Sequence, residues 1–295
     1  MPSEIAHLYE NEADRSVSDE FDAQQLDTGK WDYRTAPTSA NWLQSNTSLE
    51  NQGEDRYLEL RGEWKRTAGA DGFVTGTGSS SGIYSKKTMG HGFYTARWRV
   101  EGISPNHKSS WHPAIWCHRS IPTTTNPSRL PQDHIELDFV EFSQSRTQNI
   151  QWHCQAVEWV RNREESRMTP IESSSWSSDF QEGVWSTHGL EYHPDYVQLW
   201  EFDEISRQWS QRGEKISITT AATDKKALNI NKSSAHEQAY WILSNYDFFE
   251  RVNKMWEPYH GRKVKSTDNF LMSESSLQID YFRFRPLKTG NADDQ

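Results

Sequence analysis

The chain has 295 residues, of which 34% are hydrophobic, and its 32 basic and 42 acidic residues give a formal net charge of −10. A mean hydropathy of −0.94 with no long apolar run excludes a transmembrane span, and the acidic balance argues against nucleic acid or an anionic membrane as the main partner. The 14 tryptophans in so polar a chain indicate a folded protein and are typical of sites that bind the apolar face of a sugar ring.

The two cysteines, Cys117 and Cys154, are not part of a spaced Cys/His cluster of the zinc-binding kind. We therefore expect neither a disulfide framework nor a zinc site. The stretch from Met1 to Arg15 has no basic region followed by an apolar run. We expect a secreted or periplasmic protein whose signal peptide has been removed, with an intracellular protein as the alternative.

Strand-like patterns run through most of the chain. Residues 94–100 and 150–156 alternate strictly between apolar and polar side chains, as expected of strands with one exposed face. Further strand-like runs are, in chain order, Tyr57–Arg61, Gly82–Lys86, Pro113–Cys117, Ile135–Phe142, Tyr196–Phe202 and Leu277–Phe284. Many strands without intervening helices predict an antiparallel all-β sandwich or barrel, a class that often uses this chain length as one domain.

The domain predicted in this way spans residues 17–286, with residues 1–16 and 287–295 as terminal tails. Three long segments interrupt the strand pattern and are expected to form loops: 118–133, 162–182 and 245–269. Loops of this length in a compact β domain are usually functional or disordered.

The most informative run reads H-I-E-L-D-F-V-E-F and ends the central strand-like segment. Its first half alternates, which places Glu136 and Asp138 on one face. The phase then slips, because Phe139 and Val140 are both apolar, and Glu141 joins its two companions only if the strand absorbs one extra residue. A β-bulge does this, and bulges are enriched beside active sites. The sequence therefore predicts three carboxylates in a row on one open sheet face.

Three acids on one face repel one another, which raises the pKa of at least one of them. With the bulge, the Cα atoms of Glu136 and Glu141 are about four strand steps, or roughly 13 Å, apart. Inward-leaning side chains would then bring the two carboxyl groups to about 5 Å, the separation of a retaining glycosidase, with Asp138 between them. An acidic strand face in contact with solvent, or a cation site, is the alternative.

The run from Glu136 to Glu141 resembles the E-[IL]-D-x-x-E signature of glycoside hydrolase family 16. The resemblance extends from about Ser18 to Pro286. Ser18–Phe21 is similar to the opening strand of that family, and W-H-P-A-I-W, from Trp111 to Trp116, is similar to the segment that precedes its catalytic strand. Together these motifs are specific.

The resemblance implies a β-jelly-roll sandwich of two curved antiparallel sheets with an open substrate cleft on the concave face. It implies Glu136 as nucleophile, Asp138 as its helper and Glu141 as acid/base in an endo-acting, retaining double displacement. No cofactor is required for this reaction, and we expect a monomer. A structural calcium ion is common in the fold, although no ligand spacing in this sequence identifies a site for it.

Within the family, the E-F-S-Q run that begins at Glu141 looks most like kappa-carrageenases. We therefore expect cleavage of β-1,4-galactosidic linkages in a sulfated red-algal galactan, of the carrageenan or furcellaran type. The alternatives are a β-agarase or porphyranase, a laminarinase-like β-glucanase, or transglycosylation by the same residues. A non-catalytic carbohydrate-binding jelly-roll is the alternative from a different class.

Three aromatic residues and one histidine are candidate substrate contacts. Trp42 resembles a position that stacks on a sugar in agarases and carrageenases, Trp116 resembles the aromatic residue beside the cleaved bond, and Trp111 begins the same motif. His153 lies on the polar face of the strand expected next to the catalytic one, where the resemblance places it near the reacting carboxylates. Core packing is the alternative role for the tryptophans.

The segment 245–265 has five basic and three acidic residues in a chain that is acidic overall. Its interleaved aromatic rings and guanidinium groups suit a sulfated sugar. We name Arg251 and Trp256 as candidate contacts there, and the resemblance places Arg251 near an arginine that contacts substrate sulfate in carrageenases. A solvated charged loop is the alternative.

Overall fold

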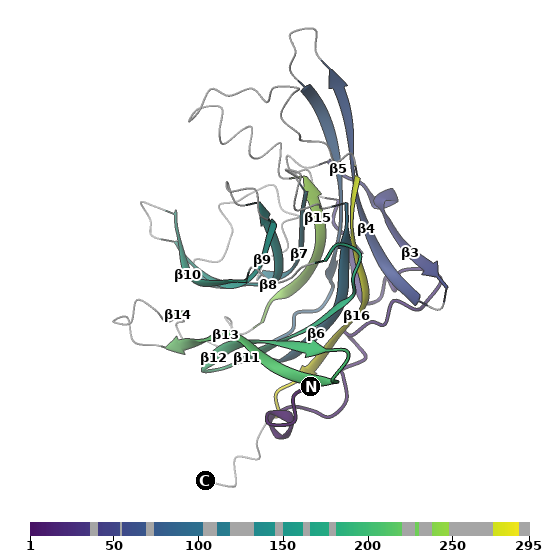
Figure 1. The fold of residues 1–295 in the computed structure, drawn as a ribbon. Helices are drawn as coiled ribbons and strands as arrows, with labels where there is room; N and C mark the ends of the chain where they lie inside the picture. The colour runs from purple at the N-terminus through teal and green to yellow at the C-terminus, as the bar shows by residue number, and fades with distance from the viewer. Residues whose placement is uncertain are drawn as a thin grey trace, which may run out of the picture.

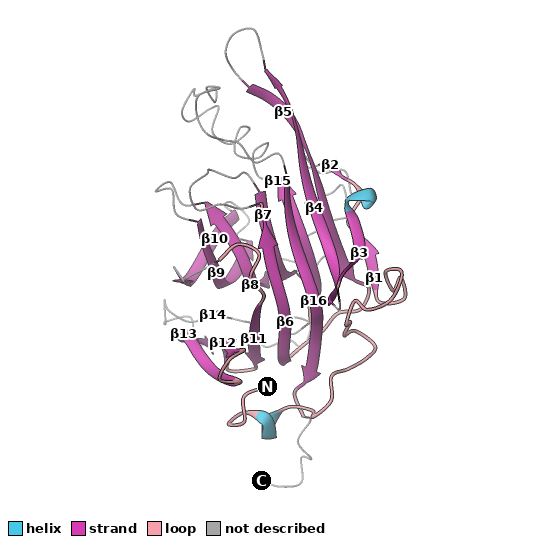
Figure 2. Cartoon of the chain, turned by 45° about the vertical axis from the view of Figure 1, so that its right-hand side comes forward, coloured by secondary structure: helices cyan, strands magenta, loops and turns pink. Residues whose placement is uncertain are grey.

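The structure is a computed structural model, which describes residues 1–35, 41–53, 55–68, 74–102, 111–118, 133–144, 150–161, 166–176, 181–219, 228–229, 238–247 and 274–288. In these residues the secondary structure is almost entirely β (Figure 2). Two short 3₁₀ helices accompany the strands. None of the described helices is both long and apolar enough to cross a membrane.

The first three strands along the chain are short, and the later strands are longer except β14. In chain order they are η1 (Ala6–Leu8), β1 (Trp31–Tyr33), β2 (Asn41–Trp42), η2 (Gln44–Asn46), β3 (Thr47–Gln52), β4 (Asp55–Ala68), β5 (Val74–Ser85), β6 (Gly92–Glu101), β7 (Trp111–His118), β8 (Asp133–Gln144), β9 (Ile150–Arg161), β10 (Ser166–Trp176), β11 (Ser186–His193), β12 (Tyr196–Asp203), β13 (Gln208–Thr219), β14 (Leu228–Asn229), β15 (Tyr240–Asp247) and β16 (Glu274–Pro286). Each run predicted as a strand lies in or overlaps one of them.

The strands form two curved layers that share one hydrogen-bonded path. Its order is β10-β9-β8-β7-β15-β5-β4-β16-β6-β11-β12-β13-β14, with β1 and β2 beside β5 and β3 beside β4. Strand β5 joins the layers, because residues 81–84 pair with β15 whereas residues 74–79 pair with β4. Figure 1 shows the part from β10 to β15 curled above β6 and β11–β13. The predicted sandwich of two curved antiparallel sheets is therefore confirmed.

The core fills the space between the two layers. Strand β6 supplies Tyr94 and Trp98 from its inward face, as its alternation predicts, and both are buried. Trp98 meets Phe142 of β8 edge-on with ring centroids 5.5 Å apart, and Tyr94 lies 4.4 Å from Trp241 of β15. Full burial of such a side chain stabilises the fold by about 1.5–3 kcal/mol relative to exposure. These aromatic contacts hold β8 and β15 of one layer against β6 of the other.

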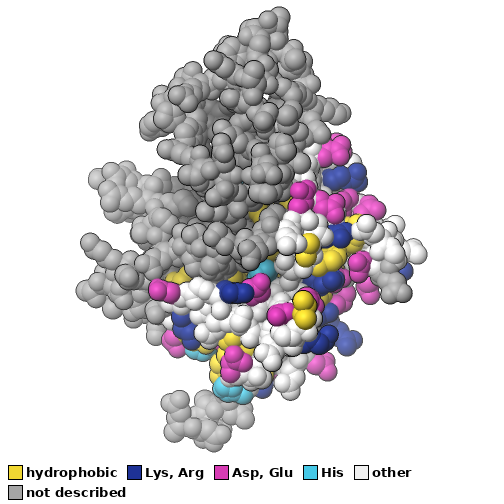
Figure 3. Space-filling view, in the orientation of Figure 1, with side chains coloured by type: hydrophobic (Ala, Val, Ile, Leu, Met, Phe, Trp, Pro, Cys, Tyr) yellow, Lys and Arg dark blue, Asp and Glu magenta, His cyan; other side chains and the backbone are white. Residues whose placement is uncertain are grey.

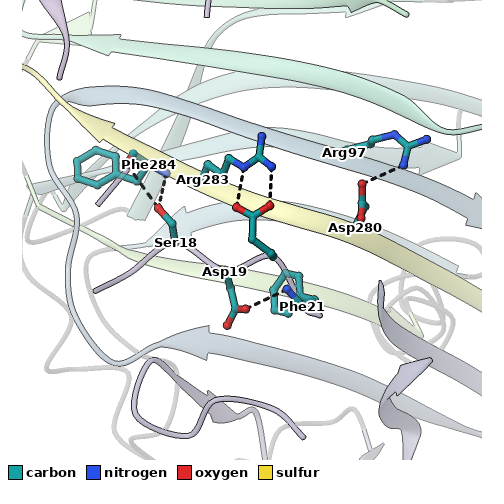
Figure 4. Close-up of polar contacts among 8 residues, drawn as sticks. Ser18, Asp19, Phe21, Arg97, Asp280, Arg283 and Phe284 are labelled. Atoms are coloured by element: carbon teal, nitrogen blue, oxygen red, sulfur yellow. Dashed lines mark hydrogen bonds and ion pairs between the residues drawn. The ribbon is translucent and has the colours of Figure 1, made fainter. Parts of the chain in front are cut away.

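The opposite face of β6 is polar, and its two arginines have polar partners on β16. Arg97 donates to Asp280 of β16 at 2.9 Å (Figure 4), and Arg99 donates to Gln278 at 2.5 Å. On the side of the molecule seen in Figure 3, the described acidic and basic side chains are interspersed and do not gather by sign. This mixture is typical of a solvated surface.

The segment 1–16, expected to be a tail, packs against the domain. Tyr9 is fully buried, pairs with Leu287, and donates its hydroxyl hydrogen to Glu191 of β11 at 2.9 Å. Tyr196 also donates to this carboxylate, at 2.7 Å. The partners of Tyr9 lie far along the chain, so local sequence patterns could not reveal that this segment is docked.

Next to it, the run that resembles a family opening strand is fixed to β16. Ser18 Oγ accepts a hydrogen bond from the Phe284 backbone N–H at 2.9 Å, and Asp19 accepts one from the Phe21 N–H at 3.0 Å (Figure 4). The second carboxylate oxygen of Asp19 accepts a hydrogen bond from the Trp31 indole at 2.9 Å. One acid therefore orients the entry of the chain into β1.

The expectation of a loop over 162–182 is wrong for its middle part, which forms β10. This strand pairs antiparallel with β9, with a register shift between Ile171 and Ser174. Serine and glutamate have low β propensity, but an adjacent strand whose backbone groups need partners outweighs that preference. Residues 119–132 and 248–269 of the other two expected loops lie outside the described residues.

His188 on β11 is a buried titratable group that stacks on the core residue Trp98 of β6. Its Nδ1 accepts a hydrogen bond from the Trp98 indole at 3.1 Å. Burial lowers the pKa of His188 to about 3 from its ordinary value of 6.5, and the positive charge of Arg212 adds to the effect. As the pH falls, His188 therefore binds a proton near pH 6.5 in the unfolded chain but only near pH 3 in the folded chain.

We predict that the free energy of unfolding falls as the pH is lowered from about 6.5 toward 3, with His188 contributing a slope of up to about 1.4 kcal/mol per pH unit. Urea unfolding at several pH values in this window measures the slope. His188→Asn keeps an acceptor for Trp98 and should remove this contribution, whereas the exposed His7→Asn should not. Equal slopes for wild type and His188→Asn would contradict the assignment.

Candidate active site

Strand β8 contains the predicted bulge at the predicted place. Asp138 pairs with Gln155 of β9 and Glu141 pairs with His153, so three steps on β8 face two on β9. The same shift separates the pairs that β8 makes with β7. Phe139 and Val140 are both fully buried in the core. The extra residue is therefore absorbed on the core side, as the phase slip in the sequence requires.

The bulge places the three acids on the side of β8 that is turned away from the core. We call this side of β7 and β8 the acid face; its residues are His112, Ala114, Trp116, His118, Glu136, Asp138 and Glu141. The side chains of Glu136 and Glu141 are 15% and 18% exposed, whereas Asp138 is only 2% exposed. The two outer acids are accessible, and the middle one is enclosed between them.

Strand β7 places one histidine beside each outer acid. His112 Nε2 lies 2.5 Å from Glu141 Oε1, within hydrogen-bond distance, and His118 Nε2 lies 3.9 Å from Glu136 Oε2. Sequence reasoning did not select either histidine. The signal was present, since residues two apart on a strand share a face, and the two histidines are six apart on the strand next to the acids.

Of the predicted sugar contacts, Trp116 belongs to the acid face, and Trp42 shares a neighbour with it, Arg34. The Arg34 guanidinium carbon is 4.2 Å from the Trp42 ring and 5.3 Å from the Trp116 ring. Trp42 also stacks on Tyr246 of β15 with centroids 5.9 Å apart, and is only 8% exposed. Trp116 is more open and donates its indole hydrogen to Ser244 at 3.2 Å. Much of the Trp42 ring surface is thus covered by protein.

Arg34 brings a positive charge to this group of residues, and the sequence analysis missed it. Burial lowers the pKa of Arg34 to about 10, while attraction to Tyr246 and Glu136 acts in the opposite direction. The guanidinium therefore remains cationic at neutral pH. Its Nε is buried and has no hydrogen-bond partner. Attraction between Arg34 and Glu136 offsets part of the repulsion among the three carboxylates.

The remaining predicted contacts are placed differently. Trp111 lies in the core, on the face of β7 opposite His112, which favours its core-packing alternative. His153 occupies the register position opposite Glu141, but its side chain lies outside the described part of the chain. Arg251 and Trp256 also lie outside it. The roles of these residues stay predictions.

Cys117 on β7 and Cys154 on β9 lie on the two strands that flank β8. Cys117 is a free, buried thiol, and burial raises its pKa. Within the described ranges, no group of three or more His, Cys, Asp or Glu side chains is arranged to hold a metal ion. A structural calcium ion, which is common in the fold that the sequence resembles, has no site assigned among these residues.

Comparisons with known proteins show what the fold is similar to. No protein-family model and no curated protein matches the sequence. Among solved structures, the kappa-carrageenase of Pseudoalteromonas carrageenovora in complex with a kappa-carrageenan tetrasaccharide has a TM-score of 0.59 at 14% identity, over 93% of this chain and 94% of that chain.

Two further structures extend the comparison to glucan-active proteins. The catalytic domain of a Thermotoga petrophila endo-1,3-β-glucanase has a TM-score of 0.55 at 13% identity, over 94% of this chain and 99% of that chain. A Bacteroides ovatus mixed-linkage-glucan protein of family 16, solved with its product, has a TM-score of 0.57 at 13% identity, over 91% and 99%. The expected resemblance to family 16 is therefore confirmed for the fold of nearly the whole chain.

We predict energetic coupling between Arg34 and Glu136. In a double-mutant cycle of Arg34→Gln and Glu136→Gln, the double variant should lose less free energy of unfolding than the two single variants together, by about 0.5–3 kcal/mol. The reason is that each single change leaves the opposite charge in the site without its partner. Urea unfolding at pH 7 measures the cycle. Arg34→Gln with the exposed Glu214→Gln should be additive; equal additivity of both pairs would refute the coupling.

Proposed function

We propose that the protein is an endo-acting, retaining glycoside hydrolase of family 16 that cleaves β-1,4-galactosidic linkages in a sulfated red-algal galactan, of the carrageenan or furcellaran type. The observation that carries the proposal is the bulge in β8, which aligns Glu136, Asp138 and Glu141 on one face. An array of carboxylates costs stability because like charges repel. A catalytic role for these three acids explains why the protein carries an array that lowers its stability.

In the first half of the proposed reaction, Glu136 is ionised and attacks the anomeric carbon of the sugar. The bond from that carbon to the leaving oxygen breaks, and Glu141 gives its proton to this oxygen. A covalent glycosyl-enzyme results. Arg34 supports the ionised state of Glu136 by charge attraction. Asp138 lies between the two outer acids and is almost fully buried.

In the second half, Glu141 has become a carboxylate and removes a proton from water. The water oxygen attacks the anomeric carbon from the side that the leaving group vacated, and Glu136 is released. Two inversions at this carbon retain its configuration. The bonds in this scheme are made and broken by Glu136 and Glu141, both on the acid face, and the scheme requires no cofactor.

The substrate class rests on the E-F-S-Q run after the acid, on the basic and aromatic segment 245–265, and on the likeness to a kappa-carrageenase fold. A β-agarase or porphyranase and a laminarinase-like β-glucanase are the alternatives, because similar folds also occur among glucan-active proteins. Incubation with kappa-carrageenan, furcellaran, agarose, porphyran and laminarin, followed by sizing of the products, separates them. Short oligosaccharides from kappa-carrageenan and furcellaran alone are the expected result.

We predict that Glu136→Gln lowers the release of reducing ends by more than about 10⁴-fold, because an amide cannot form the glycosyl-enzyme. Binding of the polysaccharide, followed by affinity electrophoresis, should persist. Glu214→Gln, an exposed change on β13, should leave hydrolysis unchanged. A carbohydrate-binding protein without catalysis would release no reducing ends as wild type, and that result would end the enzyme assignment.

A second prediction concerns Glu141. Glu141→Gln should lower polysaccharide hydrolysis by about 10²–10⁴-fold, since the leaving oxygen needs a proton. The glycosylation step with a 2,4-dinitrophenyl β-glycoside, whose leaving group needs none, should stay near the wild-type rate. Stopped-flow detection of dinitrophenolate measures that step. Equal losses on both substrates would show that Glu141 is not the acid.

A further inference from the structure

His112 is held in one place by contacts with two neighbouring strands. It lies on β7, its ring meets Tyr246 of β15 edge-on with centroids 5.6 Å apart, and its Nε2 lies 2.5 Å from Glu141 Oε1 of β8. The side chains of His112 and Glu141 are both largely buried. A short contact between two such groups in a low-dielectric site is stronger than the same contact in water.

This contact exists only because of the bulge. His112 and Ala114 share a face of β7, and Ala114 pairs with Glu141. Without the extra residue in β8, Glu141 would point into the core and its carboxylate would be out of reach of the imidazole. The same local feature thus forms the row of acids and joins its last member to a second titratable group.

We propose that His112 is a positioning residue that shares the acid/base proton with Glu141, so that the pair and not the carboxyl alone holds this proton between turnovers. The inference rests on the proposed function, in which Glu141 must be protonated in the first half of the reaction and ionised in the second. A proton that can bind to either of two bases in contact is lost at higher pH than from the carboxyl alone.

Other charged or titratable groups face the pair from the surrounding elements. Asp138 and Glu136 lie on β8, His118 on β7, Tyr246 on β15, and Arg34 beside Tyr246. His153 occupies the register position opposite Glu141 on β9. The negative carboxylates favour retention of a proton at the pair, whereas Arg34 opposes it, and neither replaces the direct contact of His112.

Two variants separate proton sharing from packing. His112→Phe keeps an aromatic ring against Tyr246 but removes the nitrogen, and His112→Gln keeps a polar group near the position of Nε2 but does not titrate. In both we expect the alkaline limb of kcat/KM against pH to move to lower pH by about one unit or more, on the polysaccharide that the wild type cleaves fastest. KM should stay within about threefold, and kcat at pH 8 should fall about tenfold or more.

The reaction with the 2,4-dinitrophenyl β-glycoside tests the same idea without a need for the acid. Its glycosylation rate should be unchanged in both variants, because His112 acts through Glu141. A purely structural role predicts that the losses of activity in both variants follow from a lower melting temperature. An unmoved alkaline limb in both variants, or equal losses on the two substrates, would overturn the inference.

Two controls distinguish failure of this inference from failure of the proposed function. His7→Gln, an exposed change far from β8, should give the wild-type pH profile. Glu141→Gln is measured in parallel: if it keeps polysaccharide hydrolysis, the proposed function is wrong and the inference falls with it. If Glu141→Gln is inactive while both His112 variants keep the wild-type profile, the inference alone is overturned.

Discussion

The period of two along a β-strand is the constraint on which the site depends. Glu141 has the wrong parity to join Glu136, and only the extra residue absorbed at Phe139 and Val140 corrects it. Both bulge residues are fully buried, and the neighbouring Phe142 packs on Trp98 of the opposite layer. Packing in the core therefore fixes the backbone of the bulge. The acids on its outward face are positioned by these apolar contacts, although their own side chains take no part in them.

Aromatic side chains and Arg34 form a chain of contacts that runs from Glu141 to Glu136. In order, its members are Glu141, His112, Tyr246, Trp42, Arg34, Trp116, His118 and Glu136. The chain links the two outer acids by the route that does not pass through Asp138. It combines flat apolar surfaces with charge compensation, a combination that suits a ligand with an apolar ring face and a polar rim.

Much of this arrangement could be predicted from the sequence, and the limits have a physical cause. The strands with strict alternation and the bulge were predictable because each is a local pattern, as in residues 94–100. His112 and His118 were not selected, since their importance arises from the register of β7 on β8. Arg34 was not selected because it lies about a hundred residues before the acids in the chain. Strand β10 was missed because its partner strand, not its composition, determines its conformation.

The docking of the first residues has a consequence for how the chain can be rearranged. The Tyr9–Leu287 pair and the hydrogen bond from the Lys288 N–H to the Leu8 carbonyl bring the two end segments side by side (Figure 1), at the edge far from β8. A short connector could therefore join them, and new ends could be opened at the exposed turn between β12 and β13. Such a circular permutant would keep every contact of the acid face while β13–β16 would be synthesised before β1–β12.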